Sequence, residues 1–152
     1  MAGLLHDVGR LVLYSQAPEQ ALEVFEAYRR GGTLLREAEV QVLGYDHAQI
    51  GEGLLLAWHY PLNLVEAVAC HHRPQSAGAF HTEAALVHLA DHLVNAMQIG
   101  SSGERYVPAL QTKAWDQLNL PVSFLETLVK SIDEQMEIVG EVFLHGRQMA
   151  TR

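Results

Sequence analysis

Apolar residues recur at intervals of three and four positions along most of this chain, which is the period of an amphipathic α-helix. No stretch alternates apolar and polar residues for long enough to predict a strand. Glycines, prolines and capping residues divide the pattern into successive helices. The predicted helices cover approximately residues 3–15, 18–30, 33–43, 46–59, 61–72, 82–99, 111–118, 121–130 and 131–149, with a loop over 75–80.

Capping residues predict where two of these helices begin. Thr33 is a plausible N-cap for the helix over 33–43, because a hydroxyl oxygen can accept a backbone N–H of the first turn. Asp46 is followed three residues later by Gln49, which is the spacing of a capping box. The two helices flank Gly44, a residue typical of a helix end.

The organisation predicted from this pattern is a single all-α domain, a helical bundle. Its core is expected in residues 1–99. Residues 100–110 contain glycines, serines and a proline and read as a linker-like loop. Residues 111–152 are expected to add C-terminal helices to the same domain.

Composition narrows the functional classes. The chain has 152 residues, 49% of them hydrophobic, with 10 Lys+Arg against 18 Asp+Glu and a net charge of −8. Such a chain repels nucleic acid, and no basic cluster offsets the balance. The longest apolar runs fall far short of the roughly 20 residues of a membrane-spanning helix, and the N-terminus does not resemble a signal peptide. A single cysteine, Cys70, favours a reducing cytoplasm. We therefore expect a cytoplasmic protein without nucleic-acid or membrane partners.

Histidine is the unusual residue, with nine copies. Because a helix turns about 100° per residue, spacing predicts which side each residue faces. His47 shares an apolar face with Ile50, Leu54 and Trp58. His71 and His72 share an arc with Leu64, Val65 and Val68 of the same predicted helix, over 61–72. A single inward-facing histidine is more often a hydrogen-bonded core residue than a metal ligand. Several such histidines on neighbouring helices favour a functional site instead.

Other polar residues give weaker signals. His88 and His92 fall on the polar side of their helix, so a solvated face is the preferred interpretation. His6, Asp7 and Arg10 lie opposite the apolar arc of the first helix, and a solvent face explains that stripe equally well.

The remaining candidates combine imidazole and carboxylate ligands without a thiolate, which suits iron, manganese, zinc or nickel rather than a cysteine-based structural zinc site. Two adjacent ions could share such a set through a carboxylate, with a bridging water as nucleophile. Arg10, one turn after His6, is a candidate for holding a phosphate oxygen. The candidate metal ligands are His6, Asp7, His47, His71, His72 and Asp91.

Several motifs resemble those of a known family. Residues 3–10 (GLLHDVGR) look like the hallmark segment of the HD superfamily of metal-dependent phosphohydrolases. The rest is similar to the HDOD domain, its signalling branch: Glu39 with residues 43–51 resembles the central motif. Three further segments, 58–61 (WHYP), 69–72 (ACHH) and 86–91 (LVHLAD), follow in the family's order. The match covers about residues 3–98, and it is specific because the motifs fall in sequence.

The resemblance implies an all-helical HD-type fold, in which the candidate ligands match by position the metal ligands of the related HD-GYP cyclic-di-GMP phosphodiesterases. Three departures stand out. Those enzymes have a lysine where this chain has Arg10, and their Gly-Tyr-Pro signature is absent after His72. Family members also have an upstream helical region with a further ligand, so we expect a fragment or a shortened protein with an incomplete site. Uncovered core surface then favours a homo-oligomer.

Three functions remain open. The first is a regulatory HDOD module in bacterial signal transduction that binds a signalling protein or small ligand without turnover. The second is a metal-dependent phosphohydrolase acting on a nucleotide or cyclic dinucleotide, with His6, Asp7, His47 and Asp91 as minimal ligands. The third is a metal-binding sensor without catalysis. The first is preferred, so the interpretation leans away from an enzyme. Metal analysis combined with a phosphodiesterase assay separates the three.

Overall fold

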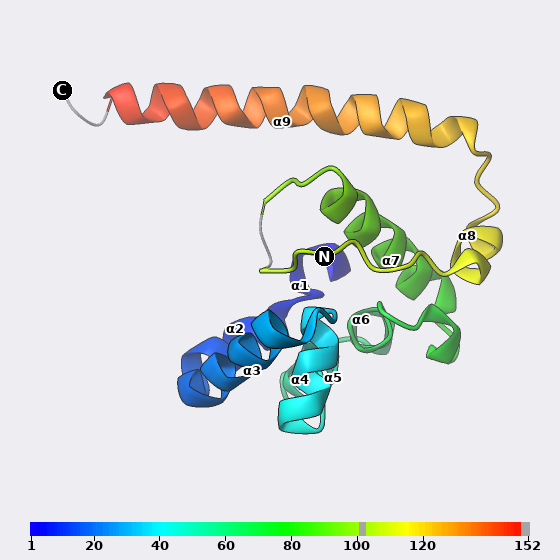
Figure 1. The fold of residues 1–152 in the computed structure, drawn as a ribbon. Helices are drawn as coiled ribbons and strands as arrows, with labels where there is room; N and C mark the ends of the chain where they lie inside the picture. Colours follow the sequence, from blue (N-terminus) through cyan, green and yellow to red (C-terminus); the bar gives the residue numbers. More distant parts are fainter. Residues whose placement is uncertain (101–102, 150–152) are drawn as a thin grey trace. The chain divides into compact units, whose positions relative to one another are not determined.

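The computed structural model describes residues 1–100 and 103–149, and these residues form helices, turns and loops without a strand. The all-α prediction is therefore confirmed. The chain divides into two compact units, Met1–Leu118 and Asn119–Arg152. The first unit contains α1 (Ala2–Leu5), α2 (Val8–Gln16), α3 (Pro18–Gly31), α4 (Leu35–Leu43), α5 (His47–Ala57), α6 (Leu62–Ala69), the 3-10 turn η1 (Pro74–Ser76), α7 (His81–Ala96) and α8 (Thr112–Leu118) (Figure 1).

The second unit contains the long helix α9 (Ser123–Met149). The sequence predicted two helices here, over 121–130 and 131–149, and that prediction is wrong. Lys130 and Ser131 lie inside α9, because neither residue interrupts a helical backbone. No helix in the described part of the chain combines the length and the apolar character needed to cross a membrane.

Within the first unit the helices pack in pairs. α2 packs against α5, α3 against α4, and α6 against both α5 and α7, while α8 packs on α7. The short helix α1 contacts α6 and α7. The N-terminal segment therefore lies beside α6, which precedes His71 and His72, and beside α7, which contains Asp91.

Two buried clusters hold these pairs together. Val24, Tyr28, Leu35 and Ala38 join α3 to α4. Leu55, Val65 and Val68 join α5 to α6. Each large apolar side chain contributes about 1.5–3 kcal/mol when it is removed from water. The second cluster fixes the angle between the helices that lead to His47 and to the paired histidines.

The crossing of α2 over α5 depends on a glycine. A Cβ atom at Gly9 would overlap the carbonyl oxygen of His47 and lie 2.9 Å from the amide nitrogen of Gly51. The two backbones therefore touch at this point, with no room for a side chain. This contact places the start of α2 directly on the first turn of α5, where His47 lies.

The loop between α7 and α8 is tied to the core. Glu104 accepts hydrogen bonds from the Tyr28 hydroxyl, at 2.9 Å, and from the backbone nitrogen of Leu35, at 2.7 Å. The second bond satisfies an N–H group at the start of α4, which has no partner within the helix. Within the first unit, Glu104 thus ties the predicted 100–110 loop to α3 and α4.

Helix starts and stops agree only partly with the sequence patterns. Asp46 caps α5 as predicted: its Oδ1 accepts the Gln49 amide and the Gln49 side chain accepts the Asp46 amide, both at 3.1 Å. Gly32 and Gly44 end α3 and α4 with positive φ values of 62° and 85°. Thr33 is not the N-cap of α4; the structure places Leu34 there, and Glu37 accepts the Leu34 amide.

Two predicted helices are also shorter or broken. The continuous helix predicted over residues 3–15 is wrong, since α1 ends at Leu5 and α2 begins at Val8. His6 and Asp7 occupy the break, where tertiary contacts hold the Asp7 side chain. The helix predicted over 61–72 ends at Ala69, so the paired histidines follow it in a turn.

Candidate functional site

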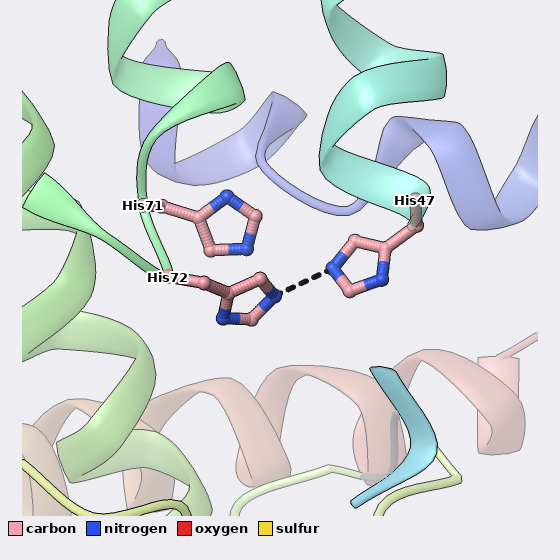
Figure 2. A group of neighbouring side chains, drawn as sticks. All are labelled: His47, His71 and His72. Atoms are coloured by element: carbon pink, nitrogen blue, oxygen red, sulfur yellow. Dashed lines mark hydrogen bonds between the residues drawn. The ribbon is translucent and has the colours of Figure 1, made fainter. Parts of the chain in front are cut away.

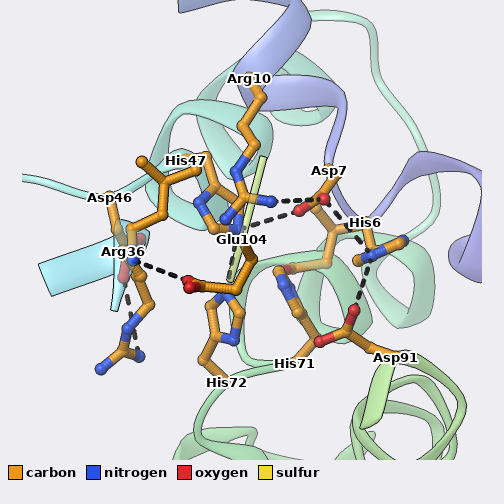
Figure 3. A network of polar contacts seen from close by, with 12 residues as sticks. His6, Asp7, Arg10, Arg36, Asp46, His47, His71, His72, Asp91 and Glu104 are labelled. Atoms are coloured by element: carbon orange, nitrogen blue, oxygen red, sulfur yellow. Dashed lines mark hydrogen bonds and ion pairs between the residues drawn. The ribbon is translucent and has the colours of Figure 1, made fainter. Parts of the chain in front are cut away.

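Residues from four separate segments meet in the first unit. His6 and Asp7 come from the break between α1 and α2, and His47 is the first residue of α5. The paired histidines follow α6, and Asp91 lies in α7. Figure 3 shows all of these candidate metal ligands around one centre.

Three histidines form the first group. The side-chain nitrogens of His47, His71 and His72 that could bind an ion all lie within 4.8 Å of one another. The Nε2 atoms of His47 and His72 are 2.9 Å apart (Figure 2). His47 and His71 are completely buried. The convergence that the inward faces predicted is therefore present, whereas metal ligation by these residues stays a prediction.

A second group shares one of these histidines. His6, Asp7 and His71 also offer ligand atoms within 4.8 Å of one another. Asp91 joins through His6, with its Oδ1 3.5 Å from His6 Nε2. Asp7 connects the two groups, because its Oδ1 lies 3.0 Å from His47 Nε2 and its Oδ2 lies 3.7 Å from His6 Nε2.

One nitrogen at the centre has no partner. His71 Nδ1 donates to the backbone oxygen of Val68 at 2.7 Å, which leaves Nε2 as the nitrogen with the free lone pair. That Nε2 is buried and has no hydrogen bond. An unsatisfied buried polar atom costs about 1–3 kcal/mol. A lone pair aimed at other imidazole and carboxylate groups is what a divalent ion requires, so the residues present fit a metal.

Beside this cluster Arg10 and Glu39 form a buried ion pair, a contact that the sequence patterns did not predict. Glu39 is 1% exposed, and its carboxylate accepts hydrogen bonds from both the backbone nitrogen and Nδ1 of His47. Its other oxygen accepts from Arg10 Nε at 3.2 Å, and Arg10 Nη1 donates to Asp7 at 2.8 Å. Glu39 belonged to a recognised motif, but only the tertiary structure shows its partners.

Charge and burial set the protonation of the cluster. Burial alone would raise the pKa of Asp7, but the hydrogen bond with His47 and the positive charge of Arg10 lower it far below its usual range. Burial would also raise the pKa of Glu39, which the contact with His47 lowers instead. Burial lowers the pKa of His71 to about 3, assisted by the charge of His47. Burial lowers the pKa of His72 as well, so both members of the pair are neutral.

These shifts predict a pH dependence of stability. The folded-state pKa of His71, about 3, lies below the ordinary histidine value of 6.5, so the unfolded chain binds more protons between these values. The contribution of His71 to stability is therefore present above pH 6.5 and falls as the pH drops. His6 and His47, whose pKa values are raised, act in the opposite direction. We isolate His71 by comparing urea unfolding of the wild type and His71→Gln between pH 7.5 and 4.5. The difference in free energy of unfolding is expected to shrink toward acid pH, and a constant difference would contradict it.

The structure corrects the interpretation of His88 and His92. Both were predicted on a solvated face, and both are buried, with exposed fractions of 2% and 7%. α8 and the preceding loop cover that side of α7: His88 Nε2 accepts the amide of Gln111, and His92 Nε2 donates to the carbonyl of Pro108. Helical phase could not reveal this, because the covering segment is more than fifteen residues away in the chain.

Open space adjoins the cluster on two sides. A cavity of about 180 Å³ is bordered by Arg10, Arg36 and His72 among others. A second cavity, of about 430 Å³, lies beside His6, Asp91 and Tyr106. Asp7 borders both cavities. A small molecule in either space would therefore lie next to the candidate ligands.

Comparison with known proteins gives two matches. Residues 1–74 match the family model of the HDOD domain. A crystal structure of an HDOD domain protein with unknown function from Geobacter sulfurreducens matches with a TM-score of 0.72 at 20% sequence identity. That match covers 93% of this chain and 51% of the Geobacter chain, so this chain spans about half its length. No curated protein matches. The second match shows a shared fold.

Proposed function

Since residues 1–74 of this chain belong to the HDOD domain family, we propose that the protein is a regulatory HDOD module that binds a divalent metal ion without turning over a substrate. The observation that carries the proposal is the buried, unpartnered Nε2 of His71. It faces nitrogen and oxygen atoms of neighbouring candidate ligands in both groups. This proposal unites the signalling and the metal-sensor interpretations of the sequence.

The donor set indicates the class of ion. His47, His71 and His72 would hold an ion in the first group, and His6, Asp7 and His71 in the second, where Asp91 lies beside His6. Neutral imidazoles and ionised carboxylates suit iron, manganese, zinc and nickel. A bound ion would supply positive charge and an open position for an anionic ligand in the adjoining cavities. A signalling protein or a small ligand that recognises the metal-bound form is part of the same proposal.

Arg10 supports a role in binding an anionic ligand. Its Nε and Nη1 atoms already bond Glu39 and Asp7, and the residue is 7% exposed. The guanidinium neutralises these two carboxylates and also borders the cavity of about 180 Å³, so its remaining N–H donors could hold an anionic ligand there without leaving them.

We expect the metal-stripped protein to bind added zinc, manganese or iron(II), as measured by titration calorimetry and by metal analysis after desalting. His72→Gln should weaken binding by about 100-fold, because even loss of an outer partner of a ligand typically costs 10–100-fold. His81→Gln is the matched control, since His81 is exposed and contacts the Gly78 carbonyl instead.

A product assay on cyclic dinucleotides with each metal in turn should show no hydrolysis. Absence of metal binding by the wild type would overturn the proposal. Hydrolysis that is lost in Asp7→Ala would replace it with the metal-dependent phosphohydrolase.

Self-association stays a prediction. Leu4 and Leu11, from the apolar arc of the first predicted helix, are 83% and 68% exposed. Two large apolar side chains open to solvent on α1 and α2 support a homo-oligomer.

A further inference from the structure

The turn after α6 brings two consecutive side chains into one centre. In a helix, neighbouring residues point about 100° apart. His71 and His72 lie beyond the end of α6, and their ring centroids are 3.9 Å apart. The Cys70 amide donates to the Glu66 carbonyl at the end of α6, and the Arg73 amide donates to the Cys70 carbonyl. Neither of these two bonds involves the backbone of His71 or His72, so other contacts must set the position of the turn.

His88 supplies one of these contacts. Its Nδ1 donates to the carbonyl oxygen of His71 at 2.8 Å, and its Nε2 accepts the backbone amide of Gln111 at 3.2 Å. Both bonds are satisfied by a single neutral tautomer, with the proton on Nδ1. The ring is 2% exposed, so it links α7, the turn and the start of α8 within the protein interior.

Gln111 supplies the other contact. Its side-chain amide donates to the carbonyl oxygen of His72 at 3.0 Å. Its own carbonyl accepts the amide of Ala114 at 2.9 Å, so Gln111 is also the residue on which α8 begins. The start of α8 thus holds His72 directly and His71 through His88.

We infer that Gln111 and His88 are positioning residues for the His71–His72 pair, so that occupancy of the histidine cluster is coupled to the start of α8. The metal part of this inference rests on the proposed function. A shift of the turn changes where both imidazole nitrogens point, and it also changes the bonds that define the first residue of α8. Such coupling is reciprocal: if the start of α8 affects metal affinity, the metal affects the start of α8.

The test compares Gln111→Ala and Gln111→Glu with Gln117→Ala. Glutamate keeps the size of Gln111 but cannot donate to the His72 carbonyl. Gln117 lies in the same helix and contacts Thr82 and Gln75. Cobalt(II) serves as the metal probe, since its visible absorption reports ligand geometry. Both Gln111 variants should bind cobalt about tenfold more weakly, with shifted bands. Gln117→Ala should match the wild type in affinity and spectrum.

A metal-free measurement separates the inference from the proposed function. Two-bond nitrogen–proton NMR reports the ring nitrogens of His71 and His72 directly. Their signals should move in both Gln111 variants and stay in place in Gln117→Ala. If the wild type binds no cobalt while these signals move, the proposed function fails and the positioning role stands. Unchanged ring signals in the Gln111 variants would overturn the inference, as would unchanged cobalt affinity and spectrum when the wild type binds.

Discussion

Gly9→Ala is expected to lower the free energy of unfolding by roughly 3 kcal/mol or more, at the upper end of overpacking effects. The added Cβ would overlap the carbonyl oxygen of His47 and approach the Gly51 nitrogen to 2.9 Å. Both are backbone atoms of α5, so no side-chain rotation can relieve the contact. α2 and α5 must separate, which also moves His47 away from Asp7.

Urea unfolding followed by circular dichroism measures the loss. Gly53→Ala is the matched control in α5: nothing lies within 4 Å of its Cβ position. Because alanine favours a helix over glycine by about 1 kcal/mol, that variant should gain stability. A Gly9→Ala protein as stable as the wild type would show that the helices do not touch as described.

Glu39→Ala is expected to cost about 3–5 kcal/mol, the range for breaking a buried ion pair by removing one partner. Glu39 is 1% exposed and accepts from Arg10 and twice from His47. Its removal leaves the guanidinium with only Asp7 and leaves the amide and ring N–H of His47 without their acceptor. The cost is large against the 5–15 kcal/mol that stabilise a typical domain.

Two further variants serve as controls for Glu39→Ala. Glu39→Gln keeps the volume and one acceptor oxygen, so it should recover part of the loss. Glu23→Ala, on an exposed position of α3, should stay within about 0.5 kcal/mol of the wild type. A loss below 1 kcal/mol for Glu39→Ala would contradict the buried pair.

The sequence alone determined the features that depend on near neighbours in the chain. The three- and four-residue period gave the helices, and the Asp46–Gln49 box and the glycines at 32 and 44 gave several of their ends. His47 was placed inward correctly, because its direction follows from helical phase and the apolar residues of its own helix. The order of the motifs indicated the family before any geometry was known.

Only the tertiary structure decided which segments meet. It broke the first predicted helix at His6 and Asp7, because Arg10 and His47 hold Asp7 more firmly than helix propensity holds the backbone. It buried His88 under a segment that starts beyond the end of its own helix. It also revealed the contact between Glu39 and Arg10. From sequence alone, a carboxylate in a helix is expected on the surface, because its cationic partner lies far away in the chain. Helical periodicity records only whether a position faces inward, whereas the choice of partner depends on packing between helices that are distant in the chain.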